Sequence, residues 1–456
     1  MTIKLPPRGQ RNGPIYQAIA DAIAGEIEAG RLKPGSRLPT QRVLARQLGV
    51  TLTTVTRAYV EAQRRGLLSG EVGRGTFVRP TALEADDAPH GMLDLAVNAL
   101  MPHPYMEELA DRLTAAIPRT SGARVFSYQP QAGARHNRAA GSAWISATGL
   151  DAPVDRIIIT AGGQHSLMIA LMSLTKPGDE VLVEEFTYPG VSDLAEHLHL
   201  RLRPLPLDKE GIRPDALSDA CRTGKPVALY CVPSFQNPTT GLMSEKRRME
   251  IAAIAATNGV IVIEDDVYGF LAPGVKPMSS YLTESQFFYI TSTSKSIAPG
   301  IRIGYLLAPT SAIECASMAV LRSIVNAPPA MAELTTSLII DGVAGRIVDW
   351  KRKEILARQE IATRALRGFT LQTHPQSPHV WVYLPEPWRA DAFIARARHR
   401  GIFLNGAESF AVGHETDVQA VRVALGPPAT RAALEDGLNE LVRIVNRVPE
   451  VYELVV

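Results

Sequence analysis

A single lysine stands among small hydroxylated residues in the segment 292–296 (STSKS), directly after an apolar run. An arginine, Arg302, follows Lys295 seven residues later. A lysine amine placed after a buried strand can form a Schiff base with a carbonyl compound, and hydroxyl groups and a guanidinium can hold a phosphate. These residue types therefore suit a phosphorylated carbonyl cofactor. A simple surface lysine is the alternative.

Three acids and a tyrosine close another apolar run, in the segment 263–268 (IEDDVY). A carboxylate that faces a pyridine nitrogen keeps that nitrogen protonated and makes the ring an electron sink. A metal site is the competing interpretation, but no histidine cluster supports it.

Three further segments carry weaker signals. Glycines between a strand and a helix, such as Gly163 before Gln164, let backbone N–H groups point at an anion. Tyr188 offers an aromatic plane that could stack on a ring or simply pack, and Asn237 offers an amide in a loop where it could equally form a turn. The three segments are 161–165 (AGGQH), 185–190 (EFTYPG) and 233–241 (PSFQNPTTG).

The elements that must position these groups alternate between strands and helices. Strand-like apolar runs are separated by helical patterns, which predicts an α/β body with a mostly parallel sheet. In such sheets ligands bind beyond the carboxyl ends of the strands, where each motif above lies. The predicted strands are 157–160, 181–184, 227–232, 260–264, 288–291 and 303–308, and two of the helices are 165–175 and 245–257.

The first 80 residues follow a different pattern, which predicts a winged helix-turn-helix domain. Apolar residues at helical spacing predict a first helix between Pro14 and Gly30. Thr40 and Thr51 are suited to cap a second and a third helix, and the glycine-rich stretch 67–78 is typical of a hairpin. The expected inward-facing residues are Val43, Leu44 and Leu48 on the second helix and Val55, Ala58, Tyr59 and Ala62 on the third.

Charge separates the same two regions. Residues 1–80 hold 13 Lys and Arg against 5 Asp and Glu, a net charge of +8, whereas the rest holds 35 against 41, a net charge of −6. A basic head on a mildly acidic body suggests that the head meets a polyanion, and a solvated surface is the alternative.

The head resembles the GntR-type winged-helix family through the strings PGSRLPTQRVLARQLGV and TTVTRAYVEAQRRGLLSGEVGRGTFV. The resemblance implies binding to double-stranded DNA, with the third helix in the major groove. Leu52 stands where the family often has arginine, so the base preference of this head should differ from that of family members with the arginine. The implied DNA contacts are Arg42, Thr53, Thr54, Thr56, Gly73 and Arg74.

The five body motifs, in their order, resemble the fold-type I, aspartate-aminotransferase-like enzymes that use pyridoxal 5′-phosphate. By this resemblance Lys295 is the Schiff-base lysine, Asp265 rather than Asp266 is the partner of the pyridine nitrogen, and Tyr188 stacks on the ring. Tyr268 and Asn237 would contact the ring hydroxyl group. The phosphate would be held by Gly163, Gln164, Ser292 and Arg302, with Tyr128 contributed by a neighbouring subunit, and Arg422 would clamp a substrate carboxylate.

Head and body together resemble the MocR subfamily of transcription regulators, which implies a PLP-dependent homodimer that senses an amine or amino acid. The expected domains are a winged-helix head at 1–80, a linker at 81–91 and an aminotransferase-like body at 92–456 that ends in a small α+β subdomain. A working aminotransferase with an accessory head is the alternative function. Storage or delivery of the cofactor is a third idea that no sequence feature favours.

Composition excludes several other classes of protein. The chain has 456 residues, 46% of them hydrophobic, which is ordinary for a globular protein. It lacks an apolar run of roughly 18–20 residues and a signal-peptide pattern, so a cytoplasmic protein that does not enter membranes is expected. Its three cysteines, Cys221, Cys231 and Cys315, are too few for a disulfide framework or a zinc cluster.

Overall fold

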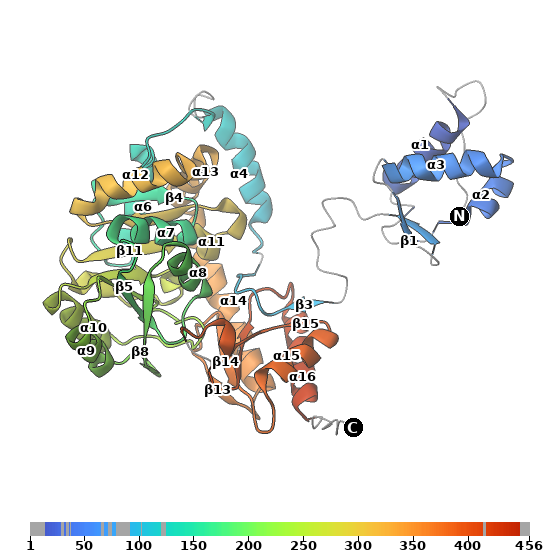
Figure 1. Ribbon diagram of the computed structural model, residues 1–456. Coiled ribbons are helices and arrows are strands. Elements are labelled where there is room, and N and C mark those ends of the chain that lie inside the picture. Colours follow the sequence, from blue (N-terminus) through green and yellow to red (C-terminus); the bar gives the residue numbers. More distant parts are fainter. Residues whose placement is uncertain are drawn as a thin grey trace. The chain divides into compact units, whose positions relative to one another are not determined.

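The computed structural model divides the chain into two compact units, residues 1–91 and 92–456, each considered by itself below (Figure 1). The expected linker at 81–91 lies outside the residues that the structure describes. Those residues are 14–28, 32, 36, 38–64, 68–71, 75–78, 92–101, 103–119, 125–413 and 416–446.

The head consists of three helices and a two-stranded hairpin. The stripe predicted for the third helix is confirmed, because Val55, Ala58, Tyr59 and Ala62 are all buried. They pack with α1 residues around one small apolar core, and the Tyr59 hydroxyl donates to the Pro39 carbonyl over 2.7 Å. The elements are α1 (Ile15–Glu28), α2 (Gln41–Leu48), α3 (Leu52–Arg64), β1 (Leu68–Glu71) and β2 (Gly75–Val78).

The structure confirms one of the two predicted helix caps in the head and corrects one predicted core residue. Thr51 caps α3, since its Oγ1 accepts from the Thr54 N–H over 3.2 Å, whereas Thr40 begins α2 without a side-chain cap bond. The prediction that Val43 faces inward was wrong, because its side chain is 46% exposed. In an eight-residue helix the core stripe passes through Leu44 and Ala45, and the residue before them turns about 100° away from it.

The body is built on a seven-stranded sheet in the order β4-β12-β11-β10-β9-β5-β6. Only β12 runs antiparallel to its neighbours, so the predicted mostly parallel sheet is confirmed. The sequence pattern missed β6, which carries Arg201, Arg203 and Pro204; such residues fit this strand because it lies at the sheet's edge. The strands are β4 (Ile157–Thr160), β5 (Glu180–Glu184), β6 (Arg201–Leu205), β9 (Ala228–Cys231), β10 (Ile261–Asp265), β11 (Phe287–Ser292) and β12 (Gly304–Leu307).

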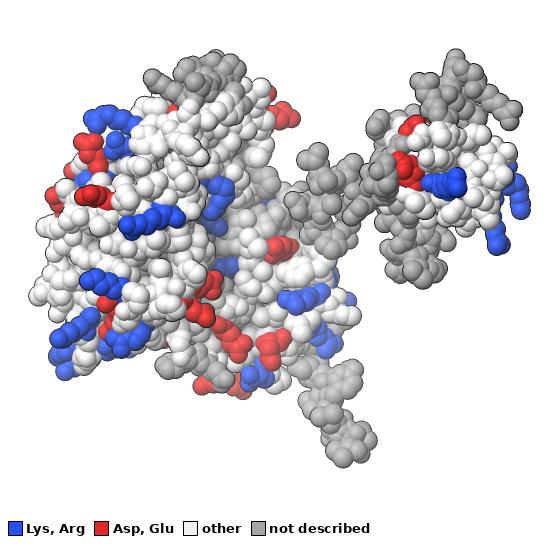
Figure 2. Space-filling model, turned by 45° about the horizontal axis from the view of Figure 1, so that its top comes forward, with Lys and Arg blue, Asp and Glu red and all other residues white. Residues whose placement is uncertain are grey.

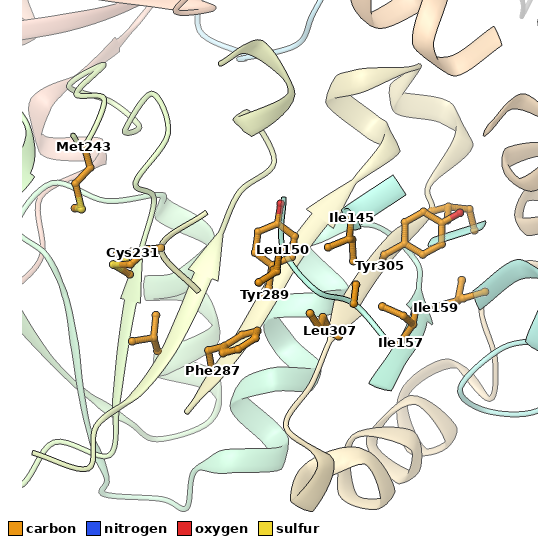
Figure 3. Packing of buried hydrophobic residues seen from close by; sticks show 14 of the residues in the cluster. Ile145, Leu150, Ile157, Ile159, Cys231, Met243, Phe287, Tyr289, Tyr305 and Leu307 are labelled. Atoms are coloured by element: carbon orange, nitrogen blue, oxygen red, sulfur yellow. The ribbon is translucent and has the colours of Figure 1, made fainter. Parts of the chain in front are cut away.

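Helices cover both faces of this sheet (Figure 1). Alternate strand residues point to opposite faces, so Tyr289 and Leu307 pack in one apolar cluster while Phe288 and Leu306 pack in another. Figure 3 shows part of the first cluster, with aromatic side chains such as Tyr289 and Tyr305 among branched ones such as Ile145 and Ile159. Its helices include α4 (Met106–Arg119), α6 (Arg135–Ser146), α9 (Pro214–Thr223), α10 (Glu245–Thr257) and α13 (Pro329–Ile340), and those of the second include α7 (Gly163–Leu174), α8 (Pro189–His197) and α12 (Ile313–Ile324).

A smaller α+β subdomain ends the body, as expected. Its sheet has the order β13-β14-β17-β16, and the long helix α14 (Val343–Ala365) contributes residues to its core as well as to the core of the large sheet. The body's first strand, β3 (Leu93–Asp94), pairs with β15 (Ile402–Phe403), which ties residues 93–98 to this subdomain. Its other elements are β13 (Thr370–Gln372), β14 (His379–Tyr383), α15 (Ala390–His399), β16 (Asn405–Gly406), β17 (Ala420–Ala424) and α16 (Arg431–Asn446).

Charges of both signs are interspersed on the face of the body seen in Figure 2. None of the helices in the described part of the chain is both long and apolar enough to cross a membrane. The same residues contain no group of three His, Cys, Asp or Glu side chains that could hold a metal ion.

Candidate cofactor site

A cavity of about 410 Å³ opens beyond the carboxyl ends of the central strands. Ten residues that the sequence marked for the cofactor or effector line it, although they come from segments up to 259 positions apart. Two larger hollows, of about 670 and 780 Å³, are lined by none of them. The ten are Gly163, Gln164, Tyr188, Asn237, Asp265, Tyr268, Ser292, Lys295, Arg302 and Arg422.

Strand pairing explains why two of the motifs meet. β10 and β11 are parallel neighbours, with Asp265 opposite Ile290, so their carboxyl ends lie at one edge of the sheet. β10 ends in Asp265, and β11 ends in Ser292, which begins the short helix α11 (Thr293–Ser296) that carries Lys295.

Lys295 is a partly buried lysine whose amine lines the cavity. Its Nζ donates to the backbone carbonyl of Asn98 and lies 5.9 Å from the centre of the Tyr268 ring. Burial, together with the positive charge of Arg422, lowers the pKa of Lys295 to about 8. A larger fraction of this amine is therefore neutral and nucleophilic near pH 7 than in an exposed lysine.

The adjacent carboxylates Asp265 and Asp266 face different surroundings. Asp265 lines the cavity, and its Oδ2 accepts from the Tyr230 hydroxyl over 2.9 Å. Asp266 does not line it, and its Oδ2 accepts from Tyr289 over 2.8 Å on the other side of the strand. Burial raises the pKa of Asp265 to about 6, so an adjacent cation would be favoured there and would lower this pKa again.

The opposite end of the cavity suits an anion. Gly162 precedes α7 with φ +94°, and a Cβ at this position would lie 2.7 Å from Nη2 of Arg302. Arg302 bonds to Ser294 Oγ and to the Ala161 carbonyl, each over 3.1 Å, beside the free N–H groups at the start of α7. Because Gln164 commits its side-chain Nε2 to the Gly190 carbonyl, its backbone N–H is the donor we expect an anion to use.

Arg422 reaches the cavity from β17 of the small subdomain. Its Nη1 donates to Asn237 Oδ1 over 2.7 Å, and its Nη2 donates to the Ala96 carbonyl. The guanidinium carbon lies 4.8 Å from the centre of the Phe410 ring, and Nε has no partner. Burial lowers the pKa of Arg422 to about 10, so it remains a cation at neutral pH and would favour an anionic ligand.

The residues that line this cavity have the chemical groups that pyridoxal 5′-phosphate needs. A carboxylate for the ring nitrogen, an amine for the aldehyde and an anion site for the phosphate face one space of suitable size. The orphaned acceptor and donor atoms at its walls, such as Arg422 Nε, indicate a polar ligand.

Several wall residues carried no signal in the sequence. Asn98, Asn405 and Phe410 line the cavity from segments without a recognisable motif. Lys351 on α14 is fully buried, and its Nζ donates to the carbonyls of Lys295 over 3.0 Å and Ile297 over 2.6 Å. Its string, WKRKE, is typical of a solvated helix face, so only the fold identifies it as a support for the lysine-bearing turn.

Tyr128 does not line the cavity, and the candidate DNA contacts belong to the head. The Tyr128 residue is 87% exposed. Of the DNA-contact candidates, Arg42 and Thr53 are exposed. Thr54 pairs with Thr51 through their hydroxyls over 2.8 Å, and Thr56 donates to Gln41 Oε1 over 2.8 Å, which ties α3 to α2. Gly73 and Arg74 lie outside the described residues.

Comparisons with known proteins agree with this division of the chain. Residues 91–441 match the family described as aminotransferase class I and II, and residues 15–78 match the gntR family of bacterial regulatory proteins. The chain is 31% identical to the uncharacterized HTH-type transcriptional regulator YdeF of Bacillus subtilis (strain 168), with 95% of each chain covered. It is 24% identical to the HTH-type transcriptional regulator TauR of Rhodobacter capsulatus, with 96% of this chain and 98% of that protein covered.

Among solved structures, the body resembles LysN, an alpha-aminoadipate aminotransferase from Thermus thermophilus complexed with N-(5′-phosphopyridoxyl)-L-leucine. The TM-score is 0.72 at 24% identity, covering 78% of this chain and 92% of that chain. The similarity establishes the fold of the body.

Proposed function

Because the chain belongs to the aminotransferase class I and II family and carries a gntR-type head, we propose that it is a transcriptional regulator controlled by an amine or amino acid. In this MocR-like arrangement the head binds double-stranded DNA in the cytoplasm, and the body binds pyridoxal 5′-phosphate together with the effector. The observation that carries the proposal is the presence, in one chain, of a cavity lined by an amine, a carboxylate and anion-binding groups, and of a three-helix head with a net charge of +8.

Different residues of the cavity would hold different parts of the cofactor. Asp265 would hold the ring nitrogen, Tyr188 would cover the ring, and Ser292 and Arg302 would hold the phosphate with the N–H groups of α7. Lys295 would supply the amine that meets the aldehyde. Pyridoxal 5′-phosphate, when bound, supplies a carbonyl that condenses with primary amines and a ring that accepts electrons.

The effector would occupy the remaining part of the same cavity. An amine competes with Lys295 for the aldehyde, and a carboxylate would pair with Arg422, which would exchange its bonds to Asn237 and Ala96 for the ligand. Since Arg422 belongs to the small subdomain and Lys295 to the large one, a ligand that binds both would favour one arrangement of the two. The test is whether such ligands change the affinity of the chain for DNA.

DNA binding by the head should depend steeply on salt, because affinity comes largely from counterion release. Arg42→Ala should weaken operator binding by roughly 1–3 kcal/mol if the exposed guanidinium reads a base. Fluorescence anisotropy with labelled operator DNA measures both effects. Arg135→Ala, which removes an exposed arginine of the body, is the control and should leave affinity unchanged. Equal affinity of the Arg42→Ala variant and the wild type would exclude Arg42 from the interface.

A homodimer would explain the exposed Tyr128. If its hydroxyl completes the phosphate site of a second subunit, Tyr128→Phe should raise the dissociation constant for pyridoxal 5′-phosphate by about tenfold, the loss of one charge-assisted hydrogen bond. Equilibrium dialysis measures the constant, and sedimentation reports the assembly. Tyr383→Phe removes a hydroxyl that bonds to Gln372 and serves as the control. A monomer with full cofactor affinity would contradict the proposal.

An active aminotransferase is the second candidate function, favoured by the full set of amine, carboxylate and guanidinium groups at the cavity. The two functions share ligand binding and differ in the result. A regulator converts its ligand slowly or not at all and changes its DNA binding, whereas an aminotransferase releases a keto acid and ignores DNA.

A further inference from the structure

Two wall residues of the cavity have a buried acceptor atom without a partner, Gln164 Oε1 beside the anion site and Asn98 Oδ1. Asn98 lines the cavity, is only 6% exposed, and its Oδ1 makes no hydrogen bond. A buried amide oxygen left unpaired costs about 1–3 kcal/mol, so such atoms in binding sites indicate a missing donor.

The orientation of this amide is fixed by a histidine behind it. Asn98 Nδ2 lies 3.0 Å from Nδ1 of His379, and His379 Nε2 lies 3.0 Å from the backbone carbonyl of Gln236. A carbonyl only accepts, so Nε2 carries the proton and Nδ1 is the acceptor. Turning the amide around would place two acceptors together. Burial holds the pKa of His379 at about 3, so the ring stays neutral and cannot protonate Nδ1 near pH 7.

The backbone of the same residue lies between the two charged groups of the site. The Asn98 carbonyl accepts from Lys295 Nζ, and two residues earlier the Ala96 carbonyl accepts from Arg422. Bonding of the Lys295 amine to the cofactor aldehyde would free the Asn98 carbonyl as well. Two acceptors of one residue then face a ligand near its amino end.

The cofactor does not supply the missing donor. The donor of a protonated pyridine nitrogen would be taken by Asp265, the phosphate brings only acceptors, and the ring hydroxyl group would be held by Tyr268 and Asn237. The effector can bring this donor, and the Lys295 amine, once displaced from the cofactor, is the competing donor.

We propose that Asn98 selects effectors whose side chain carries a hydrogen-bond donor, a hydroxyl, amide or amino group, near the carbon that bears the reacting amine. This inference rests on the proposed function and narrows its ligand class. The His379 ring positions the amide, so the acceptor is presented in one orientation before the ligand arrives.

Matched ligand pairs test the inference on the full-length protein loaded with pyridoxal 5′-phosphate. Serine against 2-aminobutyrate, threonine against valine and homoserine against norvaline each exchange a hydroxyl for a methyl group of similar size. Dissociation constants come from the change in the visible spectrum of the bound cofactor on titration. The hydroxyl member of at least one pair should bind roughly 10- to 100-fold more tightly.

The same titrations on Asn98→Ala assign the effect to this residue. The ratio within a pair cancels losses of folded protein or cofactor, and it should fall to near one in the variant. No preference in any pair of the wild type, or a preference that persists in Asn98→Ala, would overturn the inference. Equal weakening of both members leaves their ratio unchanged, so it too would overturn the inference, and it would show that the Asn98 oxygen accepts from the displaced Lys295 amine. If no amine perturbs the cofactor at all, the proposed function itself fails.

Discussion

Lys295→Ala should abolish the response of DNA binding to amines and amino acids while leaving the DNA affinity of the ligand-free chain unchanged. Lys295 is the only lysine that lines the cavity within the described part of the chain, and its lowered pKa suits it to meet an aldehyde. The variant should lose the visible absorbance of lysine-linked cofactor but retain part of its affinity through Ser292 and Arg302. Absorbance spectra and anisotropy titrations with operator DNA measure the two effects.

An exposed lysine provides the matched control. Lys176→Ala removes the same type of side chain just beyond the end of α7 and should keep both the absorbance and the response. A Lys295→Ala protein that still changed its DNA affinity with amino acids would show that the effector acts at a different site.

Asp265→Asn should produce the second large effect. The substitution keeps the shape but removes the charge that holds a protonated ring nitrogen, so affinity for pyridoxal 5′-phosphate should fall by about 10- to 100-fold, as expected for one charged hydrogen bond. In the wild type this contribution should weaken as the pH falls below about 6, because the free carboxyl then becomes protonated and no longer favours the cation.

The neighbouring residue Asp266 provides a matched control for Asp265→Asn. Asp266→Asn changes the next residue of the chain in the same way, yet Asp266 bonds to Tyr289 and does not line the cavity. Cofactor affinity, measured by equilibrium dialysis, should therefore be unchanged in this variant. If the two variants lost affinity equally, the assignment of Asp265 as the partner of the ring nitrogen would be wrong.

Sequence patterns predicted the parts of the fold that follow from short-range periodicity. Strands buried on both faces are continuous apolar runs, so β4 and β9 to β12 were predicted to within a residue or two. Strand β6 was missed because its residues include arginine and proline and only Leu205 is buried, so it forms no apolar run, whereas β4 at the other edge is buried throughout. The antiparallel direction of β12 depends on a crossover that no local pattern encodes.

The residues of the site also fall into those that a local sequence motif predicted and those that only the fold brings to the cavity. Lys295 and Asp265 each follow a strand and belong to a dense local motif, so their residue types indicated their chemistry. Asn98 stands in the string LAVNAL, which has no motif, and its importance comes from contacts with His379, 281 positions later in the chain. Val43 was misplaced because neighbouring apolar residues on a short helix compete for one narrow buried stripe.

The most direct test of the account is the affinity of the full-length chain for the DNA upstream of its own gene, measured with and without pyridoxal 5′-phosphate and a panel of amines and amino acids. We expect specific binding that at least one ligand changes by about tenfold or more, with slow or no release of keto acid. Turnover at an ordinary enzyme rate of about 1–10³ per second across the panel, with DNA affinity the same under every condition, would contradict the account and assign the chain to the aminotransferases that act on metabolites.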